Sequence, residues 1–412
     1  MKRSMATTLL FLISFPAFLK GQPKKSIEHV KNPHHVIIYH EQGHFAGWPA
    51  NNGAYLLKDN HIVVGFTEGP YKLTDGHNIS LPFTSQLARS TDGGETWKVY
   101  DPDNFVGDFD DQPRLKSLQK PINFQRPGFL MRIVGTGYHG ARDGRAHFFY
   151  SYDTGKTWRG PYGFGDLLNN SEIQKSGLDE LTPRTDYVIS GKRECLLFFS
   201  IRKKNVFASD KLFCIKTVDG GKTFSFQGWV VKPQSLKAPK DDFKVNLYPN
   251  EENNPYASEC RAVMSQTLRL DNGTLISAMR RKYIWRGGPD KDWIDVYSST
   301  DDGKNWEFLA KVAENGPANG NPPAMAETKD GRLVVIYGDR SNGTIMATYS
   351  SDKGKTWGEK KILMDDFWSE DMEFNDLGYP RLVCRKDGKL VAMYYYSTKD
   401  HLHHLRATIW EP

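Results

Sequence analysis

The feature that most constrains the fold is a short polar turn that the sequence repeats five times. Each copy has Ser or Thr at its first position, Asp at the third, Gly at the fifth and an aromatic residue at the eighth. The copies are STDGGETW from Ser90, SYDTGKTW from Ser151, TVDGGKTF from Thr217, STDDGKNW from Ser299 and SSDKGKTW from Ser350. Their aspartates lie 51 to 82 residues apart, about the length of one small antiparallel sheet with its loops. We therefore expect one such turn in each of several similar sheets.

The residue types of the repeated turn predict a structural role. The Asp can accept hydrogen bonds from the backbone, the Gly can take a positive φ, and the closing aromatic residue can pack into the neighbouring sheet. Repeated turns of this kind commonly staple hairpins. We therefore interpret the five aspartates as structural rather than catalytic or calcium-binding, and the closing aromatic residues as packing residues rather than sugar platforms.

The rest of the chain favours an all-β fold. Runs rich in β-branched and aromatic residues surround the turns, and no long segment has a helical apolar period. These runs include 61–66, 146–150, 195–201 and 333–337. A sixth sheet without a turn is expected from 382–384, 390–396 and 405–410, with 36–39 pairing into it to close the ring. The sequence thus predicts a six-bladed β-propeller of four-stranded antiparallel blades, in one domain over residues 30–412.

The N-terminus resembles a secretory signal peptide. In residues 1–21, Lys2 and Arg3 precede an apolar run that ends at Leu19, too short to span a bilayer comfortably. We therefore expect a secreted or periplasmic protein with no membrane span, and a monomer. The formal net charge of +6 is spread along the chain, so a nucleic-acid partner is not expected.

The four cysteines, Cys195, Cys214, Cys260 and Cys384, lack the short paired spacings of a zinc site. They can be interpreted as small buried residues. A disulfide between Cys195 and Cys214 is the alternative, because these two flank a predicted hairpin near Lys204.

Five S-x-D-x-G-x-T-W turns in one all-β chain resemble the Asp-box, or BNR, repeats of the sialidase (neuraminidase) superfamily. The resemblance implies the propeller, although a fold does not fix an activity. Enzymes of this family cleave a sugar that carries a carboxylate beside its anomeric carbon. They hold the carboxylate with three arginines, attack with a tyrosine that a Glu polarises, and use a separate Asp as general acid and base.

The resemblance also points to site residues. The segment 270–280 resembles the family segment that ends in the second arginine, here Arg280, and Glu259 lies upstream as the tyrosine's partner. Arg340 precedes the fifth turn as the third arginine does. The segment 377–383 matches the one that carries the nucleophile, which makes Tyr379 the predicted nucleophile. Each of these residues also has a structural interpretation, as a paired strand end or as a side chain lining the channel.

The first blade departs from the family pattern. Gly47, in Ala46-Gly-Trp-Pro49, stands where the first arginine is expected. Three residues are candidates to replace that arginine, namely Arg381, Arg261 and Arg142. Of these, Arg381 lies two residues beyond Tyr379 and so would share its strand face. Asp75, in the loop before the first turn, is the predicted general acid, although a Thr-Asp-Gly segment is also typical of a plain turn.

These residues predict a secreted, exo-acting glycoside hydrolase of the sialidase type. It would release a terminal acidic sugar, sialic acid or a similar one, from a glycan, and the mechanism requires neither a metal nor an organic cofactor. Two alternatives stay open. A polysaccharide lyase could use His44 or His77 with a tyrosine to remove the proton alpha to a uronic-acid carboxylate, and a glycan-binding propeller would need no catalysis.

Overall fold

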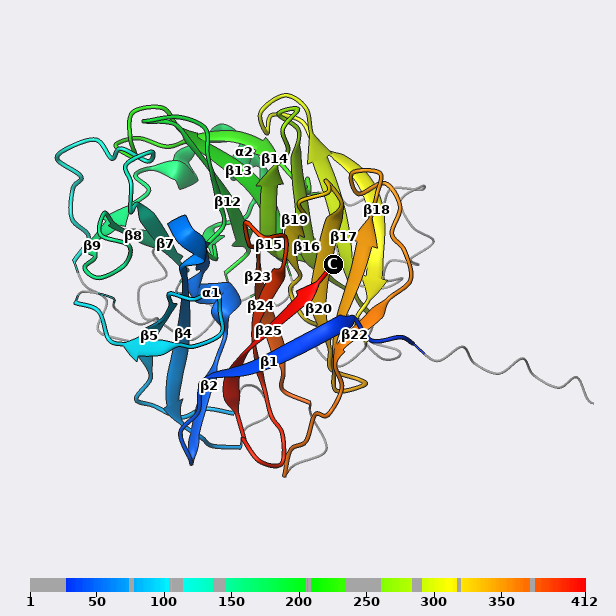
Figure 1. Cartoon of the computed structure of the whole chain (residues 1–412). Helices are drawn as coiled ribbons and strands as arrows, with labels where there is room; N and C mark the ends of the chain where they lie inside the picture. The colour runs from blue at the N-terminus through cyan, green and yellow to red at the C-terminus, as the bar shows by residue number, and fades with distance from the viewer. Residues whose placement is uncertain are drawn as a thin grey trace, which may run out of the picture.

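The computed structural model describes residues 27–73, 78–103, 105, 114–135, 146–204, 206, 209–233, 261–283, 291–316, 320–370 and 375–412. Within these ranges the chain forms six antiparallel sheets, arranged in a ring as the blades of a propeller (Figure 1). The predicted fold class is confirmed. Helices are few and short in this part of the chain, and none is long and apolar enough to cross a membrane.

Blades 1 to 3 follow one another along the chain. Blade 1 contains β2 (His44–Gly47), β3 (Ala54–Leu56), β4 (Ile62–Pro70), β5 (Thr84–Ser90) and β6 (Lys98–Tyr100). Blade 2 contains β7 (Leu130–Val134), β8 (His147–Ser151) and β9 (Arg159–Gly163). Blade 3 contains β10 (Glu180–Leu181), β11 (Tyr187–Ile189), β12 (Cys195–Arg202), β13 (Lys211–Thr217) and β14 (Ser225–Trp229).

Blades 4 to 6 complete the ring. Blade 4 contains β15 (Arg261–Arg269), β16 (Leu275–Tyr283), β17 (Lys291–Ser299) and β18 (Glu307–Glu314). Blade 5 contains β19 (Ala324–Glu327), β20 (Leu333–Asp339), β21 (Thr344–Ser350) and β22 (Lys361–Met364). Blade 6 contains β23 (Gly378–Cys384), β24 (Leu390–Tyr396), β25 (His404–Glu411) and the N-terminal strand β1 (Lys31–Tyr39). The short helices are α1 (Pro49–Asn52), α2 (Ser171–Ser176), η1 (Lys58–Asn60) and η3 (Leu167–Asn169).

Strand β1 closes the ring as predicted. It pairs antiparallel with β25, with His35 opposite Thr408 and Val36 opposite Ala407. The last blade is therefore built from both ends of the chain, which leaves the edge of β25 covered.

The described core contains seven apolar clusters, of which six lie between pairs of neighbouring blades and the seventh contains Tyr379. Because side chains alternate along a strand, each blade supplies one set of side chains to the preceding blade and the other set to the next. In β24, Tyr394 and Tyr396 pack towards blade 5 and Met393 packs towards blade 1. The six clusters link the blades in the order 1 to 6 and back to 1.

The same alternation excludes the Cys195–Cys214 disulfide. Both thiols are free and buried. In the β12–β13 ladder Cys195 pairs with Thr217, whereas Cys214 pairs with Phe198. Cys195 therefore packs towards blade 2 and Cys214 towards blade 4. Their interpretation as small buried residues is correct.

Each repeated turn connects the last two strands of its blade and is held by one set of hydrogen bonds. In blade 1 the Ser90 hydroxyl donates to Asp92 Oδ1 at 2.7 Å and accepts from the Gly94 N–H at 2.7 Å. Asp92 also accepts from the Thr96 N–H at 3.0 Å, and the Trp97 indole N–H donates to the Gly94 carbonyl at 2.9 Å. The other turns repeat these bonds, except that Phe224 has no indole. The turns are structural, as the sequence indicated.

Each turn also contacts the preceding blade. A Cβ added at Gly303, in the turn of blade 4, would lie 3.1 Å from Cys214 Sγ of blade 3. The closing Trp306 meets Phe198 edge to face, with ring centroids 5.9 Å apart. The glycine is therefore required both for its positive φ of 85° and for this close approach.

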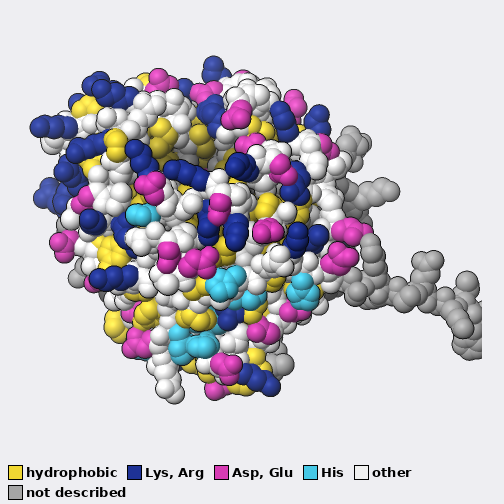
Figure 2. All heavy atoms as spheres, viewed as in Figure 1, with side chains coloured by type: hydrophobic (Ala, Val, Ile, Leu, Met, Phe, Trp, Pro, Cys, Tyr) yellow, Lys and Arg dark blue, Asp and Glu magenta, His cyan; other side chains and the backbone are white. Residues whose placement is uncertain are grey.

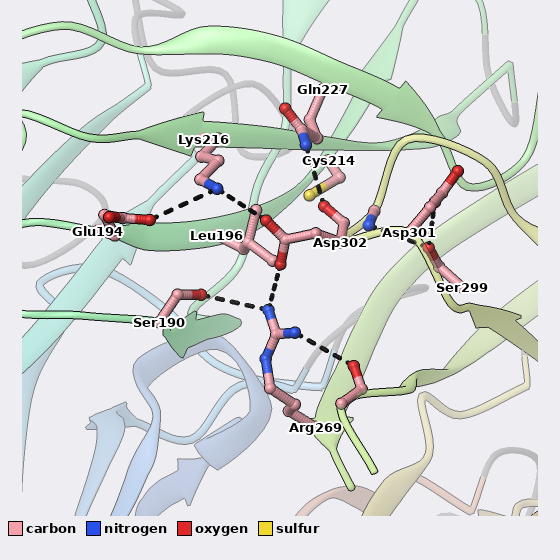
Figure 3. A network of polar contacts seen from close by, with 12 residues as sticks. Ser190, Glu194, Leu196, Cys214, Lys216, Gln227, Arg269, Ser299, Asp301 and Asp302 are labelled. Carbon is pink, nitrogen blue, oxygen red and sulfur yellow. Dashed lines mark hydrogen bonds and ion pairs between the residues drawn. The ribbon is translucent and has the colours of Figure 1, made fainter.

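Polar contacts strengthen the interface between blades 3 and 4 (Figure 3). Asp302, in the same turn, accepts from Lys216 Nζ of blade 3 at 2.7 Å and from the Arg269 guanidinium of blade 4. Gln227 Nε2 of blade 3 donates to the Asp302 carbonyl at 3.0 Å. Burial alone would raise the pKa of Asp302, but the hydrogen bonds from Lys216 and Arg269 lower it. The carboxylate thus stays charged and joins the two blades.

Blade 6 has no such turn because its third and fourth strands, β25 and β1, lie at opposite ends of the chain. The residues just before β1 make the contact with blade 5 instead. The Val30 N–H donates to the Ile362 carbonyl of β22 at 2.9 Å, and the Ile362 N–H donates to the Glu28 carbonyl at 2.8 Å. Val30 is buried among side chains of blades 5 and 6.

We predict that the turn aspartates stabilise the protein in a pH-dependent way. Burial would raise the pKa of Asp92, but hydrogen bonds from Thr96 and Ser90 lower it to about 2. Its contribution is therefore complete above the unfolded-state pKa of about 3.9 and is lost as the pH falls towards 2. Asp92→Asn should cost about 1 kcal/mol at pH 7, because solvent screens this exposed group, and less at pH 3.

Thermal or urea unfolding at both pH values measures this difference. The matched control is Asp101→Asn, which removes an exposed carboxylate of the same blade outside the turn and should change stability little at either pH. An equal loss of stability at pH 7 and pH 3 would contradict a role for the charge.

Candidate functional site

The predicted nucleophile and two predicted arginines lie at the same end of the ring, opposite the repeated turns. Neighbouring strands of a blade run antiparallel. The start of a first strand and the end of a second strand therefore lie together, away from the turn between the third and fourth strands. Tyr379 begins β23, Arg280 lies near the end of β16, and Arg340 directly follows β20. The ring thus assembles these side chains from blades 4, 5 and 6.

Tyr379 has a strained backbone that a neighbouring blade holds in place. Its φ is 45°, in the left-handed region that a bulky residue rarely adopts. The Tyr379 N–H donates to Asn321 Oδ1 at 2.7 Å, and Asn321 Nδ2 donates to the Leu377 carbonyl at 3.1 Å. The Asn321 amide therefore bridges the chain on both sides of Gly378. These bonds from Asn321, just before β19, hold the backbone of Tyr379 in its left-handed conformation.

Arg340 is fully buried beside the Tyr379 ring. Its Nη2 donates to Asp376 Oδ1 at 2.9 Å and to the Tyr395 hydroxyl at 2.6 Å, and its Nε donates to the Leu377 carbonyl at 3.3 Å. Its Cζ lies 5.6 Å from the centroid of the Tyr379 ring. Burial alone would lower the pKa of Arg340, but Tyr395 and Asp376 raise it. The guanidinium therefore keeps its positive charge next to the aromatic ring.

Arg280 lies in the same electrostatic cluster with a looser ion pair. Its Nη2 is 3.6 Å from Asp292 Oδ1, longer than a hydrogen bond, and Lys282 Nζ lies 3.2 Å from the other oxygen of Asp292. Burial lowers the pKa of Arg280. Tyr379 opposes this effect, whereas the positive charges of Arg261 and Arg340 add to it. Arg280 and Arg340 thus place two positive charges near Tyr379, each beside an aspartate, Asp292 or Asp376.

Aromatic rings fill the space beside Gly47. A Cβ on Gly47 would lie 2.7 Å from Phe45 Cε1 and 3.1 Å from Tyr395 Cγ. Phe45 packs against Trp48 and Tyr395 with centroid distances of 5.2 and 5.3 Å, and all three rings belong to the buried cluster that contains Tyr379. An arginine side chain cannot enter at this position. The first blade therefore presents an aromatic wall where the resemblance leads us to expect an arginine.

Arg381 has different partners from the Tyr379 cluster. Its guanidinium donates to the carbonyls of Ala50, in α1, and Thr185, before β11, so it joins blades 6, 1 and 3 across the centre of the ring. A register shift between Gly378 and Arg381 interrupts the alternation of β23 that we expected. Another predicted substitute, Arg261, pairs with Asp210 at 2.8 Å.

Several predicted residues lie outside the described residues. These are Glu259, Asp75, His77 and Arg142, together with Cys260. The predicted roles of Glu259 and Asp75 in the mechanism therefore stay predictions.

His44, the other predicted lyase base, belongs to a polar group in blade 1. Its Nδ1 lies 2.9 Å from Glu68 Oε2 and its Nε2 lies 3.9 Å from Glu41 Oε1. Within the described ranges these three residues are the group whose ligand atoms, all within 4.8 Å of one another, could hold a metal ion. The hydrogen bond between His44 and Glu68 already explains their proximity.

Histidine side chains gather on the face shown in Figure 2, over the region where β1, β2 and β25 lie in Figure 1. His403 stacks on Tyr71 with a centroid distance of 4.0 Å and an interplanar angle of 11°. Burial lowers the pKa of His403 to about 4, against an opposing effect of the Asp376 carboxylate. His403 is therefore neutral at pH 7, and the positive charge of the site comes from the arginines.

The sequence analysis missed three residues that support the Tyr379 cluster, namely Tyr395, Asp376 and Asn321. The alternation of side chains along a strand could have indicated that Tyr395 faces differently from its neighbours. Tyr394 and Tyr396 lie on one face of β24 and Tyr395 lies on the other. Asp376 stands three residues before Tyr379, which is a weak signal. No local pattern marks Asn321, since its bonds reach residues 56 and 58 positions away.

We predict that the contact between Gly378 and Asn321 tolerates no side chain. A Cβ on Gly378 would lie 2.1 Å from Asn321 Oδ1, and its φ is 106°. Gly388 of the same blade has a φ of 92° but has its nearest neighbour, Lys329 Cβ, at 3.7 Å. Gly378→Ala should therefore destabilise the protein by about 2 kcal/mol more than Gly388→Ala, because only the first adds a steric clash to the backbone strain.

Urea unfolding of the two variants measures this difference. In a double variant, Asn321→Ala should recover part of the loss caused by Gly378→Ala, because it removes the atoms that clash. Equal destabilisation by the two glycine substitutions would show that the Asn321 contact does not restrict this position.

Comparison with known proteins finds a partial match to a curated protein and several solved structures with a similar fold. No protein-family model matches the chain. A curated sialidase from Paraclostridium sordellii is 25% identical over 147 residues, which cover 31% of this chain and 35% of that protein. The match thus spans about a third of the relative's length.

Solved structures match over most of the chain. A protein of unknown function from Dyadobacter fermentans DSM 18053 has a TM-score of 0.60 and 16% identity, with 94% of this chain and 99% of that chain covered. The Hadza microbial sialidase Hz136 has a TM-score of 0.55 and 14% identity, with 90% and 66% covered. An α-L-arabinanase from Penicillium chrysogenum has a TM-score of 0.54 and 14% identity, with 92% and 97% covered. The chain therefore has the same β-propeller fold as these solved structures.

Proposed function

We propose that this protein is an exo-acting glycoside hydrolase of the sialidase type, which releases a terminal acidic sugar from a glycan. The observation that carries the proposal is the strained Tyr379, which Asn321 holds at the end of the ring beside the buried Arg280 and Arg340. Backbone strain of this kind is concentrated at functional sites. A tyrosine surrounded by positive charge is suited to attack a carbon next to a carboxylate.

In the proposed first step the Tyr379 hydroxyl oxygen attacks the anomeric carbon. The bond from that carbon to the aglycone oxygen breaks, Asp75 gives its proton to the departing oxygen, and the phenol proton passes to the Glu259 carboxylate. In the second step Asp75 takes a proton from water, whose oxygen attacks the same carbon. The bond to Tyr379 breaks and Glu259 returns the proton, so the enzyme regains its starting state.

The positive charge around Tyr379 supports an acidic sugar as substrate. Arg280 has the longer of the two arginine ion pairs, at 3.6 Å against 2.9 Å for Arg340. Arg280 is therefore the guanidinium that we propose contacts a substrate carboxylate, and this contact would require the buried Arg280–Asp292 pair to open. Aromatic rings take the place of the first arginine beside Gly47. This favours acidic sugars that need fewer charged contacts.

The same aromatic wall supports a second candidate, a hydrolase of neutral sugars. Phe45 and Trp48 of blade 1, together with Tyr395 of blade 6, make this side of the site apolar. One similar structure is an α-L-arabinanase complexed with arabinobiose. In this alternative the positive charge around Tyr379 would stabilise the nucleophile without holding a carboxylate.

The first test is sugar release from a panel of sialylated, uronic-acid-capped and arabinose-capped glycans, measured by mass spectrometry. We expect an acidic sugar as the product. Tyr379→Phe should lower turnover at least 100-fold, because it removes the nucleophile. The matched control is Tyr394→Phe. Tyr394 lies on the face of β24 that points away from the Tyr379 cluster, and its buried hydroxyl bonds to Thr408. Its removal should leave turnover unchanged.

Arg280→Gln tests the acidic sugar separately. It should raise KM for acidic substrates about 10-fold or more, since a charged hydrogen bond is lost. Arg269→Gln, at the opposite end of the same blade, should leave KM unchanged. A neutral sugar as the main product would favour the second candidate, and a product lighter by one water would identify a lyase. The absence of product from every glycan would favour the remaining alternative, a glycan-binding propeller without catalysis.

A further inference from the structure

We propose that Arg340, Tyr395 and Asp376 form a positioning triad, which holds a fixed positive charge against Tyr379 and does not bind the substrate. The proposal rests on the function proposed above and changes the role of Arg340 from an arm of the substrate clamp to a support of the nucleophile. It follows from the contacts of the three side chains with one another.

The triad is a closed set of hydrogen bonds. Arg340 Nη2 donates to Asp376 Oδ1 at 2.9 Å and to the Tyr395 hydroxyl at 2.6 Å. The Tyr395 hydroxyl in turn donates to the same Asp376 oxygen. Each member therefore fixes the other two, and any movement of the guanidinium breaks two bonds at once.

The triad is sealed from solvent. The Arg340 side chain is 0% exposed and the Asp376 side chain 3% exposed, and Tyr395 is fully buried. The Arg340 Nε adds a bond to the Leu377 carbonyl. A substrate carboxylate that took Nη2 from Asp376 would leave a buried carboxylate without its partner, which is costly.

The triad positions Arg340 beside the ring that has to become negatively charged. Arg340 Cζ lies 5.6 Å from the Tyr379 ring centroid, and the Tyr395 ring lies 6.0 Å from the same ring. When the phenol loses its proton during attack, the nearby guanidinium stabilises the negative oxygen without moving. Because the triad is already assembled, this stabilisation requires no reorganisation.

The charged groups around the triad agree with this role. Burial raises the pKa of Tyr395 well above its usual value, and the Asp376 carboxylate raises it further, so Tyr395 stays protonated as the donor. Arg280 contributes a second positive charge near Tyr379, and His403, whose pKa burial lowers to about 4, is neutral at pH 7. Among the described residues of the segment before β23, Asp376 is the negative group that faces Arg340.

The test compares Tyr395→Phe with Tyr394→Phe in kinetics and in binding of a free acidic monosaccharide. Tyr395→Phe keeps the ring but removes the hydroxyl from the triad. We expect kcat to fall about 10-fold, with KM and the Kd of the monosaccharide within about 2-fold of the unsubstituted protein. Tyr394→Phe should leave all three unchanged. Arg340→Gln should behave like Tyr395→Phe, whereas Arg280→Gln should weaken binding of the monosaccharide.

A second measurement does not depend on turnover. In protein labelled with 3-fluorotyrosine, the fluorine resonance of Tyr379 is assigned by its loss in Tyr379→Phe. Asp376→Asn should shift this resonance, because the guanidinium beside the ring loses its anchor, and Tyr394→Phe should not. A protein without turnover on any glycan but with this shift would overturn the proposed function and retain the triad.

Two results would overturn the triad itself. One is an unchanged fluorine resonance of Tyr379 in folded Asp376→Asn protein. The other is a Tyr395→Phe variant whose kcat equals that of Tyr394→Phe. If Arg340→Gln lost monosaccharide binding but kept its kcat at saturating substrate, Arg340 would be a substrate-binding residue and not a support of the nucleophile.

Discussion

The rest of the structure depends on the packing of each blade between two neighbours. A four-stranded sheet of this size has two apolar faces, and neither can be buried by the blade itself. The six clusters between blades bury both faces of every blade. The repeated turns serve the same interfaces, because each turn packs its glycine and closing aromatic residue onto the preceding blade, as Gly303 and Trp306 do on blade 3.

The site is a product of this ring and not of any single blade. Blade 6 supplies Tyr379, blade 5 supplies Arg340 and Asn321, and blade 4 supplies Arg280. The backbone strain at Tyr379 persists because the Asn321 amide bridges the chain around it and Gly378 leaves space for that amide. The stability of the ring thus maintains a local conformation that an isolated blade would relax.

The sequence predicted those features that come from local patterns. The turns could be recognised because Ser90, Asp92 and Gly94 bond within one short segment, and the closing strand could be inferred because the sixth sheet lacked a partner. Contacts between distant residues could not be predicted in this way. Asn321 meets Tyr379 across 58 positions, and the interrupted alternation of β23 gave Arg381 partners that its spacing did not suggest. The sequence showed that Gly47 replaces an arginine, but only the structure shows the rings of Phe45 and Tyr395 in that space.

The pairing of β1 with β25 also governs the order in which the molecule can be completed. Strand β1 is the first of the described strands and β25 the last, so β1 has no partner until β25 has been synthesised. Pairing between the two ends of a long chain is slow. Tyr379 belongs to this last blade and Asn321 to the one before it. The ring that supports the Tyr379 cluster is therefore complete only when both ends of the chain have paired, and a chain that lacks β25 leaves β1 without its partner.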